Sequence, residues 1–283
     1  MTATHISTRP IRSAQAASRA AFAALLLRDL AVLRKHLVEF VLRTLIQPFL
    51  LVFVFLYVFP EIGQSVGGGR GSAAFATVLV PGVVGISVMF QGVQAVALNL
   101  AQEFGFTREI EDRVQAPCPV WLVAVSKVVS GMVQGVIAAA IVFPIAAIVH
   151  APGVHPVFDV RWAVALTLVP LTCVAFSSLG LLLGCSFEPR NIGLMFGFIV
   201  LPITFLGGTY YQWTRLASVK VGGFSWLQTL VCVNPLIYVN EGMRAAFTDV
   251  AHMHLYVVYP VLVGFCALFL TLGIRAFRGR VLS

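Results

Sequence analysis

The chain has 283 residues, of which 59% are hydrophobic and only 11% are charged. Soluble domains carry about 25% charged residues, so this composition excludes a water-soluble globular protein. The formal net charge of +8 would suit nucleic-acid binding if the chain were soluble, but basic cytoplasmic loops explain it better in a membrane protein. We therefore expect a membrane-embedded chain with no nucleic-acid partner.

The N-terminal region divides into two predicted parts. Residues 1–14 are polar and basic and are predicted to form a disordered cytoplasmic tail. Residues 15–37 are predicted to form an amphipathic helix in the membrane interface, because apolar side chains recur at helical spacing opposite Arg28 and Lys35. An extension of the first spanning helix is the alternative. The apolar stripe consists of Phe22, Leu26, Leu30, Leu33 and Leu37.

Residues 38–275 are predicted to form a domain of six membrane-spanning helices, followed by a cytoplasmic tail at 276–283. Each apolar segment is near the length of about 20 residues that a spanning helix needs. Lys127 is the charged residue of the third segment, and its long side chain is expected to reach the membrane interface. The expected spans are 44–60, 72–100, 121–149, 162–187, 192–211 and 255–274.

Residues 221–239 are uncharged but are interrupted by glycines and by Asn234 and Pro235. They could form a seventh span or a re-entrant pair of short helices. A seventh span would move the basic C-terminal tail outside, against the tendency of basic residues to stay in the cytoplasm. We therefore predict an all-α integral membrane protein with six spans, an outer re-entrant segment and both termini in the cytoplasm.

The sequence contains no G-x-x-x-x-G-K-[ST] phosphate-binding loop and no catalytic or metal-binding motif. We therefore expect neither an enzyme nor a cofactor or metal site in this chain. The acidic residues Glu39, Glu61 and Asp159 fall at the ends of expected spans, which argues against proton- or sodium-coupled transport. The remaining possibilities are transport driven by an external energy source and passive flow through a pore.

The densest charge cluster lies between the second and third expected spans, at residues 108–113. Two i,i+4 pairs of opposite charge predict a short rigid helix there. It could be a solvated connection or a segment that docks onto another protein, and five charges in six residues of a charge-poor chain favour docking. Glu188 and Arg190, after the fourth span, form a second candidate contact. The charged residues of the first segment are Arg108, Glu109, Glu111, Asp112 and Arg113.

Polar residues interrupt the second expected span at Gln91, Gln94 and Asn99. An amide without a partner is costly in lipid, so these side chains are expected to face protein or a cavity and to line a substrate path. Aromatic residues could line the apolar part of that path, although lipid- or core-facing positions are the alternative for each. These candidates are Phe90, Phe198 and Phe205.

Three G-x-x-x-G patterns occur in the expected spans. Paired small residues let helices approach closely, either within one subunit or between two subunits. The sequence leaves both possibilities open. The pairs are Gly131 and Gly135, Gly180 and Gly184, and Gly193 and Gly197.

Several segments together resemble one known family. Residues 106–120, the sequence Gly207-Gly-Thr-Tyr-Tyr211 and residues 233–247 are similar to ABC-2 type transporter permeases, and Arg28-Asp-Leu in the N-terminal helix also fits. The likeness is closest to the daunorubicin-resistance and nodulation-export type. It extends over about residues 20–278 and is most specific in the charged loop and in the segment before the last span.

The resemblance implies the ABC-2 (type V) exporter fold in the inner membrane of a bacterium. Two permeases would stand beside each other, above two copies of a separate ATPase subunit that would hold ATP and Mg²⁺. The second permease could be an identical copy or a sister permease. Residues 15–37 would be the connecting helix, and residues 108–113, with Glu188 and Arg190, would couple the permease to the ATPase.

The resemblance also implies a route for the substrate between the two permeases, beside the second and fifth spans. The expected substrate is a hydrophobic or amphipathic small molecule or a lipid, exported by alternating access. A lipid-linked polysaccharide is the alternative substrate, and a membrane scaffold without transport is the alternative function. The outer re-entrant helices would cap the route, and they contain Asn234, Pro235, Glu241 and Arg244.

Overall fold

The computed structural model describes residues 13–62, 72–105, 118–153, 155–220 and 223–282. These residues form helices and connecting segments, so the all-α prediction is confirmed for them. The α-helices are α1 (Ala14–Lys35), α2 (Leu37–Val52), α3 (Phe59–Glu61), α4 (Ser72–Gly105), α6 (Val120–Ile148), α7 (Trp162–Ser186), α8 (Ile192–Met195), α9 (Leu201–Phe205), α10 (Trp226–Val231), α11 (Pro235–Phe247) and α12 (Leu255–Leu282). The shorter helical elements are the π-helices η1 (Phe53–Val58) and η4 (Phe196–Val200) and the 3₁₀-helices η3 (Pro189–Asn191) and η5 (Trp213–Ser218).

Five helices in the described part of the chain are long and apolar enough to cross a membrane. The predicted fifth span corresponds instead to a shorter apolar helix, Pro189–Phe205, which ends six residues before the expected residue 211. The exact count of six spans therefore stays a prediction. The five long helices are Leu37–Glu61, Ala74–Gly105, Val120–Ile148, Trp162–Ser186 and Leu255–Val281.

The first spanning helix begins earlier than the sequence pattern indicated. Instead of starting at Thr44, the helix runs without interruption from Leu37 through the π-helix η1 to Glu61. A break at His36 separates it from α1, and the His36 N–H donates back to the Val32 carbonyl. As a consequence, Arg43 is part of the spanning helix rather than of the segment before it.

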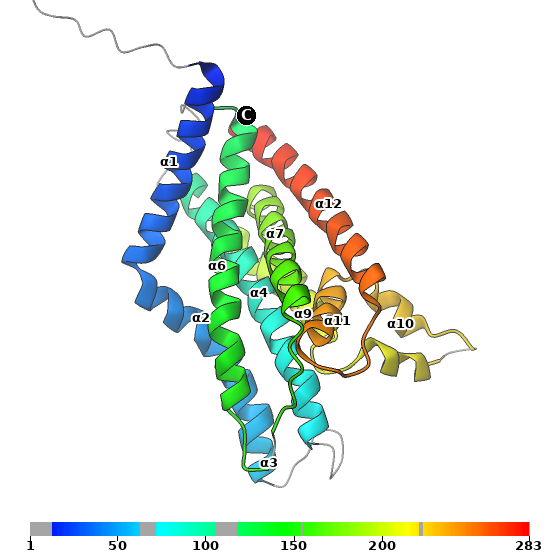
Figure 1. The fold of residues 1–283 in the computed structure, drawn as a ribbon. Helices are drawn as coiled ribbons and strands as arrows, with labels where there is room; N and C mark the ends of the chain where they lie inside the picture. Colours follow the sequence, from blue (N-terminus) through cyan, green and yellow to red (C-terminus); the bar gives the residue numbers. More distant parts are fainter. Residues whose placement is uncertain (1–12, 63–71, 106–117, 154, 221–222, 283) are drawn as a thin grey trace, which may run out of the picture.

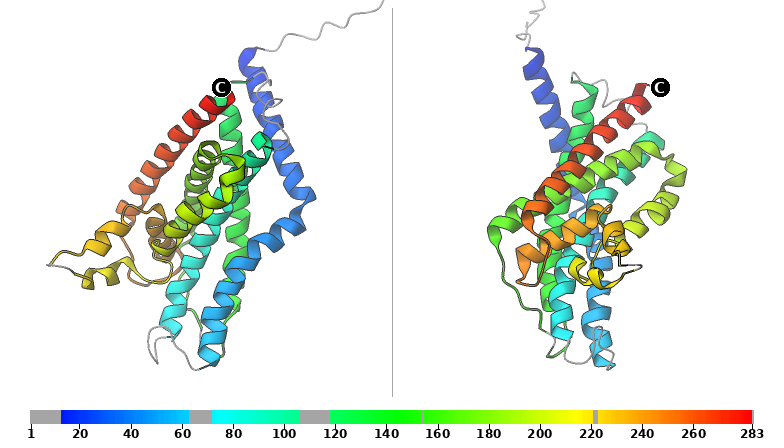
Figure 2. Two further views of the ribbon diagram at one scale, coloured as in Figure 1. Left: turned by 180° about the vertical axis from the view of Figure 1, so that it is seen from behind. Right: turned by 90° about the vertical axis from the view of Figure 1, so that its right-hand side faces the viewer.

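Both ends of the described chain lie at the same end of the helix bundle (Figure 1). The start of α1 and the end of α12 lie toward this end, while α3 and the start of α4 lie at the opposite end. The short helix α10 and its neighbouring turns project from the side of the bundle (Figure 2). The bundle is therefore a layered arrangement of long helices with one irregular region on one side.

Close packing between α4 and α7 depends on two glycines. A Cβ atom added to Gly180 would lie 2.7 Å from the carbonyl oxygen of Val93, and one added to Gly184 would lie 2.9 Å from the Cα of Ala97. A backbone neighbour at that distance leaves no space for a side chain. This G-x-x-x-G pair therefore joins helices within the chain.

The other two glycine patterns differ from each other. Gly131 and Gly135 of α6 pack against Ser177 and Cys173 of α7, so this pair also serves internal packing. In contrast, a Cβ atom added to Gly193 or Gly197 would have no neighbour within 4 Å among the residues that the structure describes, so their helix face is open.

Candidate functional site

A buried ion cluster joins three helices at the end of the bundle that holds the chain termini. The Lys127 side chain on α6 is only 4% exposed, and its Nζ lies 2.6 Å from Oε1 of Glu103 on α4 and 3.5 Å from Oδ2 of Asp29 on α1. The Lys127 ammonium group is therefore paired within the protein, and its expected position at the membrane interface stays a prediction. The antiparallel packing of α4 and α6 brings Glu103 beside the lysine, and a buried charge requires such a partner.

This ion cluster forms one wall of a cavity of about 500 Å³ between α1, α2, α4 and α6. We call it the charged groove, because its lining includes basic and acidic side chains together with polar ones. Asn99, predicted to line a substrate path, is on its wall and donates to the Ala95 carbonyl at 2.6 Å. The charged residues of the groove are Arg28, Arg43, Lys127, Asp29, Glu39 and Glu103.

A chain of hydrogen bonds crosses the bundle next to the groove. The Thr44 hydroxyl on α2 donates to Gln91 Oε1 on α4 at 3.0 Å, and Gln91 Nε2 donates to Gln134 Oε1 on α6 at 3.3 Å. Gln91 thus faces protein, as the cost of an unpartnered amide in lipid predicts. Sequence reasoning missed Thr44 and Gln134, although Gln134 interrupts an apolar span in the same way as Gln91 does.

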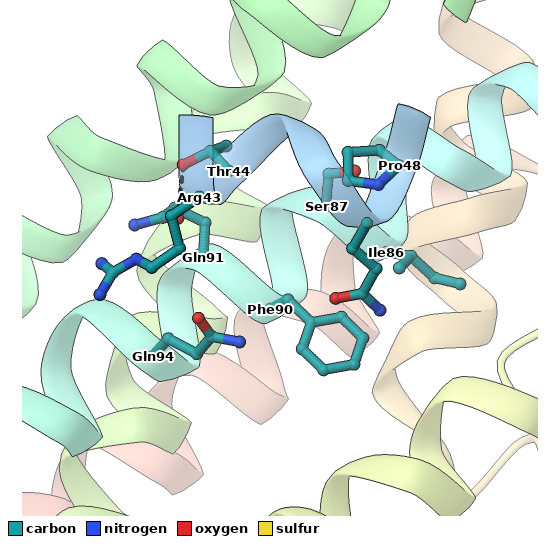
Figure 3. Close-up of a pocket in the computed structure, with 9 residues that line it drawn as sticks. Arg43, Thr44, Pro48, Ile86, Ser87, Phe90, Gln91 and Gln94 are labelled. Carbon is teal, nitrogen blue, oxygen red and sulfur yellow. Dashed lines mark hydrogen bonds between the residues drawn. The ribbon is translucent and has the colours of Figure 1, made fainter. Parts of the chain in front are cut away.

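A second, much smaller cavity of about 30 Å³ lies between α2 and α4 and shares Arg43 with the lining of the groove. Figure 3 shows that Arg43 and Thr44 from α2 lie opposite Phe90, Gln91 and Gln94 from α4 around this opening. We call it the small pocket. The structure therefore brings together three of the residues predicted for the substrate path, but it places them beside the first span.

Phe198 and Phe205 do not join these residues. They lie on the helix Pro189–Phe205, where their side chains are 78% and 62% exposed. Within the described chain, neither lines the charged groove or the small pocket. A substrate path that uses these phenylalanines together with the residues of the small pocket would need the second permease. The role of the two phenylalanines therefore stays a prediction.

The residues assigned to the outer re-entrant segment form a buried polar network. Glu241 and Arg244 of α11 are fully buried, with Arg244 Nη1 at 2.8 Å from Glu241 Oε1. The same carboxylate accepts hydrogen bonds from the backbone N–H groups of Trp213 and Met253, both at 2.9 Å. Glu241 therefore fixes the chain on both sides of α11.

The two later segments that resemble the ABC-2 family contact each other. Arg244 Nη2 donates to the carbonyls of Gly208 and Thr209, and Asn240 Nδ2 donates to the Gly207 carbonyl at 2.7 Å and to Thr209 Oγ1 at 2.9 Å. Gly208 has a φ of +71°, which a residue with a side chain rarely adopts. The expected span ends at Phe205 because this turn leads the chain away to α11.

Asn234 and Pro235 define the start of α11. The Asn234 carboxamide oxygen accepts from the Leu236 N–H at 2.9 Å, and its Nδ2 donates to the Ile203 carbonyl at 2.7 Å. Pro235 follows at the first helical position, where its missing N–H costs nothing. Asn234 thus caps α11 and ties it to α9, whereas capping of a substrate route stays a prediction.

The main predicted coupling segment, with Arg108, Glu109, Glu111, Asp112 and Arg113, lies outside the described residues. The second segment is described, and both Glu188 and Arg190 are exposed there. The residue between them, Pro189, packs against the last residue of α4. A Cβ atom added to Gly105 would lie 2.7 Å from the Pro189 Cβ.

Arg280 of α12 joins the ends of the same two helices. Its Nη1 donates to the carbonyls of Gly184, Cys185 and Phe187 at the end of α7, at 3.3, 3.0 and 2.6 Å. Its guanidinium carbon also lies 4.6 Å from the centroid of the Phe104 ring near the end of α4. The ends of α4, α7 and α12 therefore form one packed unit.

Long apolar helices with buried polar residues between them define a multi-pass membrane protein. The chain belongs to the ABC-2 type transporter family, whose family model matches residues 20–248. It is 32% identical over 232 residues to the inner membrane transport permease YadH of Escherichia coli K12, and the match covers 80% of this chain and 84% of that relative. The same identity and coverage hold for YadH of Escherichia coli O157:H7 and of Shigella flexneri. The family resemblance seen in the sequence is confirmed.

Proposed function

We propose that this chain is the membrane-spanning subunit of an ATP-driven exporter in the bacterial inner membrane. A separate ATPase subunit, in two copies, would bind ATP and Mg²⁺ and would drive alternating access in a pair of permeases. The name of the YadH relatives, inner membrane transport permease, supports the location and the transport role. Export is the direction that the family resemblance favours.

The observation that carries this proposal is the packing of the end of α4, which precedes one segment predicted to dock onto the ATPase, against the second such segment. Residues 106–117 directly follow α4, and Glu188 and Arg190 directly follow α7. Pro189 contacts Gly105, and Arg280 binds the end of α7 while stacking on Phe104. A lever must be attached rigidly to the helices that it moves, and this packed unit supplies such an attachment.

The course of the chain supports six crossings with both termini in the cytoplasm. The two ends of the described chain lie at the same end of the bundle (Figure 1), which an even number of crossings requires. The five long helices account for five crossings, and the helix Pro189–Phe205 would supply the sixth. The basic residues Arg275, Arg278 and Arg280 then lie in the cytoplasm, as the positive-inside tendency favours.

An amphipathic substrate is supported by the polarity of the two cavities. The charged groove offers ionic and polar groups, and the small pocket, which shares Arg43 with it, combines Gln91 and Gln94 with the apolar side chains of Ile86 and Phe90. A molecule with a polar head and an apolar body matches both environments. We propose that a small amphiphile or a lipid binds here before export.

The open face of the helix Pro189–Phe205 supports pairing with a second permease. Gly193 and Gly197 have no described neighbour, and Phe198 and Phe205 are exposed beside them. Glycines spaced by four residues allow close approach of another helix. Pairing there would bring the two phenylalanines beside the partner, where a shared route could use them.

The coupling proposal is tested by purifying the full-length chain together with its ATPase from native membranes. Replacing Glu109→Gln and Asp112→Asn together should reduce the bound ATPase and abolish its stimulation by the permease, while membrane insertion stays normal. Glu61→Gln is the matched control, because Glu61 is exposed at the opposite end of the bundle. Normal ATPase binding and stimulation in the double variant would overturn the proposal, as would ATP hydrolysis by the permease alone.

A further inference from the structure

Arg43 is a positively charged residue that lies within a membrane-spanning helix. The spanning helix Leu37–Glu61 has 25 residues, or about 37 Å at 1.5 Å per residue, whereas the hydrocarbon core is about 30 Å thick. Arg43 lies about 9 Å along this helix. If the helix is centred in the bilayer, its Cα lies just inside the hydrocarbon boundary, at the depth where lipid headgroups meet their acyl chains.

The other charges of the groove have partners. Lys127 pairs with Glu103 and Asp29, and Arg28 also has an interaction. Glu39 Oε2 lies 3.5 Å from His36 Nδ1, and the two form an ion pair when the imidazole is protonated. Among the residues that the structure describes, Arg43 is the charged residue of the groove whose side chain makes no hydrogen bond or ion pair.

The surroundings of Arg43 suit a ligand that carries several oxygen atoms. Arg43 lines both the charged groove and the small pocket, and Figure 3 shows it among the residues of the small pocket. Gln47 on α2 and Gln94 on α4 line the same pocket, and neither amide has a hydrogen-bond partner in the described chain. A planar guanidinium and two free amides offer the donors that a phosphate or a carboxylate accepts.

The walls around this position indicate an amphiphile rather than a free ion. Pro48, Ile86 and Phe90 form the apolar side of the small pocket. On the outer surface of α2, Leu42 and Ile46 are each 59% exposed, where they would contact lipid tails. A headgroup at Arg43 would therefore leave an attached acyl chain beside an apolar surface.

We propose that Arg43 binds the anionic headgroup, a phosphate or a carboxylate, of an amphiphile that enters the charged groove from the bilayer. The inference rests on the proposed transport function and names the chemistry by which its site recognises a substrate. Gln47 and Gln94 donate hydrogen bonds to the same headgroup. The negative charge of Glu39, one helical turn before Arg43, repels an anionic headgroup and limits the affinity of the site for it.

The test measures binding to the full-length permease, without the ATPase, in nanodiscs of phosphatidylcholine. The probes are the water-soluble short-chain lipids dihexanoyl phosphatidic acid and dihexanoyl phosphatidylcholine, and glycerol 3-phosphate serves as the headgroup without a tail. We expect phosphatidic acid to bind at least tenfold more tightly than either of the others. Equal binding of glycerol 3-phosphate would show a site for a soluble phosphate and would overturn the amphiphile assignment.

Arg43→Gln should weaken phosphatidic acid binding at least tenfold, whereas Arg43→Lys should lose only part of it. Arg34→Gln is the matched control, because Arg34 is exposed on α1 and lies outside the groove, and it should bind as the wild type does. Glu39→Gln should strengthen binding. If Arg43 served only to pair with Glu39, Glu39→Gln would weaken binding as much as Arg43→Gln does, and the proposal would fail.

A substitution at a second position keeps the proposal testable if Arg43→Gln misfolds. If Arg43→Gln does not yield a monodisperse protein, Gln94→Leu on the facing helix should weaken phosphatidic acid binding threefold or more. Unchanged binding in that variant would contradict the proposal. Because the assay contains no ATPase, a failure here leaves the coupling proposal standing, and a failure of coupling leaves the binding result interpretable.

Discussion

Lys127 Nζ lies 2.6 Å from Glu103 Oε1, and this buried pair connects the helices on either side of the charged loop. Asp29 on α1 completes the cluster at 3.5 Å. The N-terminal helix is thereby tied to the same ends of α4 and α6 between which the predicted coupling segment lies. A movement of that segment would therefore also displace α1.

Removing one member of this cluster should destabilise the protein strongly. Lys127→Met leaves Glu103 buried with one partner fewer, which should cost about 3–5 kcal/mol of the free energy of unfolding. Reversible unfolding in mixed detergent micelles measures this loss. The exposed Lys35→Met is the control and should change little. If the double variant Glu103→Gln, Lys127→Met lost the full sum of the two single losses, the two side chains would not be coupled.

The packing of α7 on α4 should be intolerant of even one methyl group. Gly180→Ala places its Cβ 2.7 Å from the Val93 carbonyl oxygen, so the helices must separate. The expected loss is about 1–3 kcal/mol in the free energy of unfolding. Gly279→Ala, whose position has open space in the described structure, is the matched control and should be neutral or slightly stabilising. Equal stability of the two variants would contradict the packing.

The open glycine face should control pairing rather than the stability of a single subunit. Gly197→Leu should weaken association of two permeases by roughly tenfold, or about 1.4 kcal/mol, because the partner helix can no longer approach. Energy transfer between labelled copies in liposomes measures this association. Gly264→Leu is the matched control, since its position in α12 is also open. The proposed pairing face would be refuted if both variants associated like the wild type.

The buried pair of α11 should hold the outer region together. Arg244→Met leaves the Glu241 carboxylate without its ionic partner and frees the carbonyls of Gly208 and Thr209, which should cost about 3–5 kcal/mol. We expect a lower unfolding temperature and faster proteolysis within residues 207–253. Arg215→Met, at an exposed position of η5, should leave both unchanged. A wild-type proteolysis rate in Arg244→Met would show that the network does not fix this region.

Local sequence patterns predicted the class of protein and most of its long helices. An apolar run of sufficient length has one stable form in lipid, a helix, because its backbone groups must bond to each other. The helix boundaries near residues 72, 121, 162 and 255 therefore agree with the expected spans within one residue. The family resemblance was also readable, because its segments are contiguous in the chain.

The sites were harder to predict because they depend on which helices pack together and in which register. Lys127 was expected to reach the membrane interface, and nothing in its own segment shows that Glu103 and Asp29 lie beside it. Gln91 was assigned to a path with the fifth span, but tertiary packing places Thr44 and Gln134 next to it. Glu241 and Arg244 were assigned to the outer segment, and that assignment did not indicate their partners between residues 208 and 253.

The sequence by itself determined that this protein is embedded in a membrane, that it is helical and that it belongs to the ABC-2 permeases. These conclusions follow from hydrophobicity and from contiguous motifs, which are local properties of the chain. Only the tertiary structure decided which charged side chains form pairs and that, among the described residues, Arg43 has no partner. The two pairings of Lys127, with Glu103 and with Asp29, join residues that are 24 and 98 positions apart. The packing of whole helices sets those distances, and no local pattern encodes them.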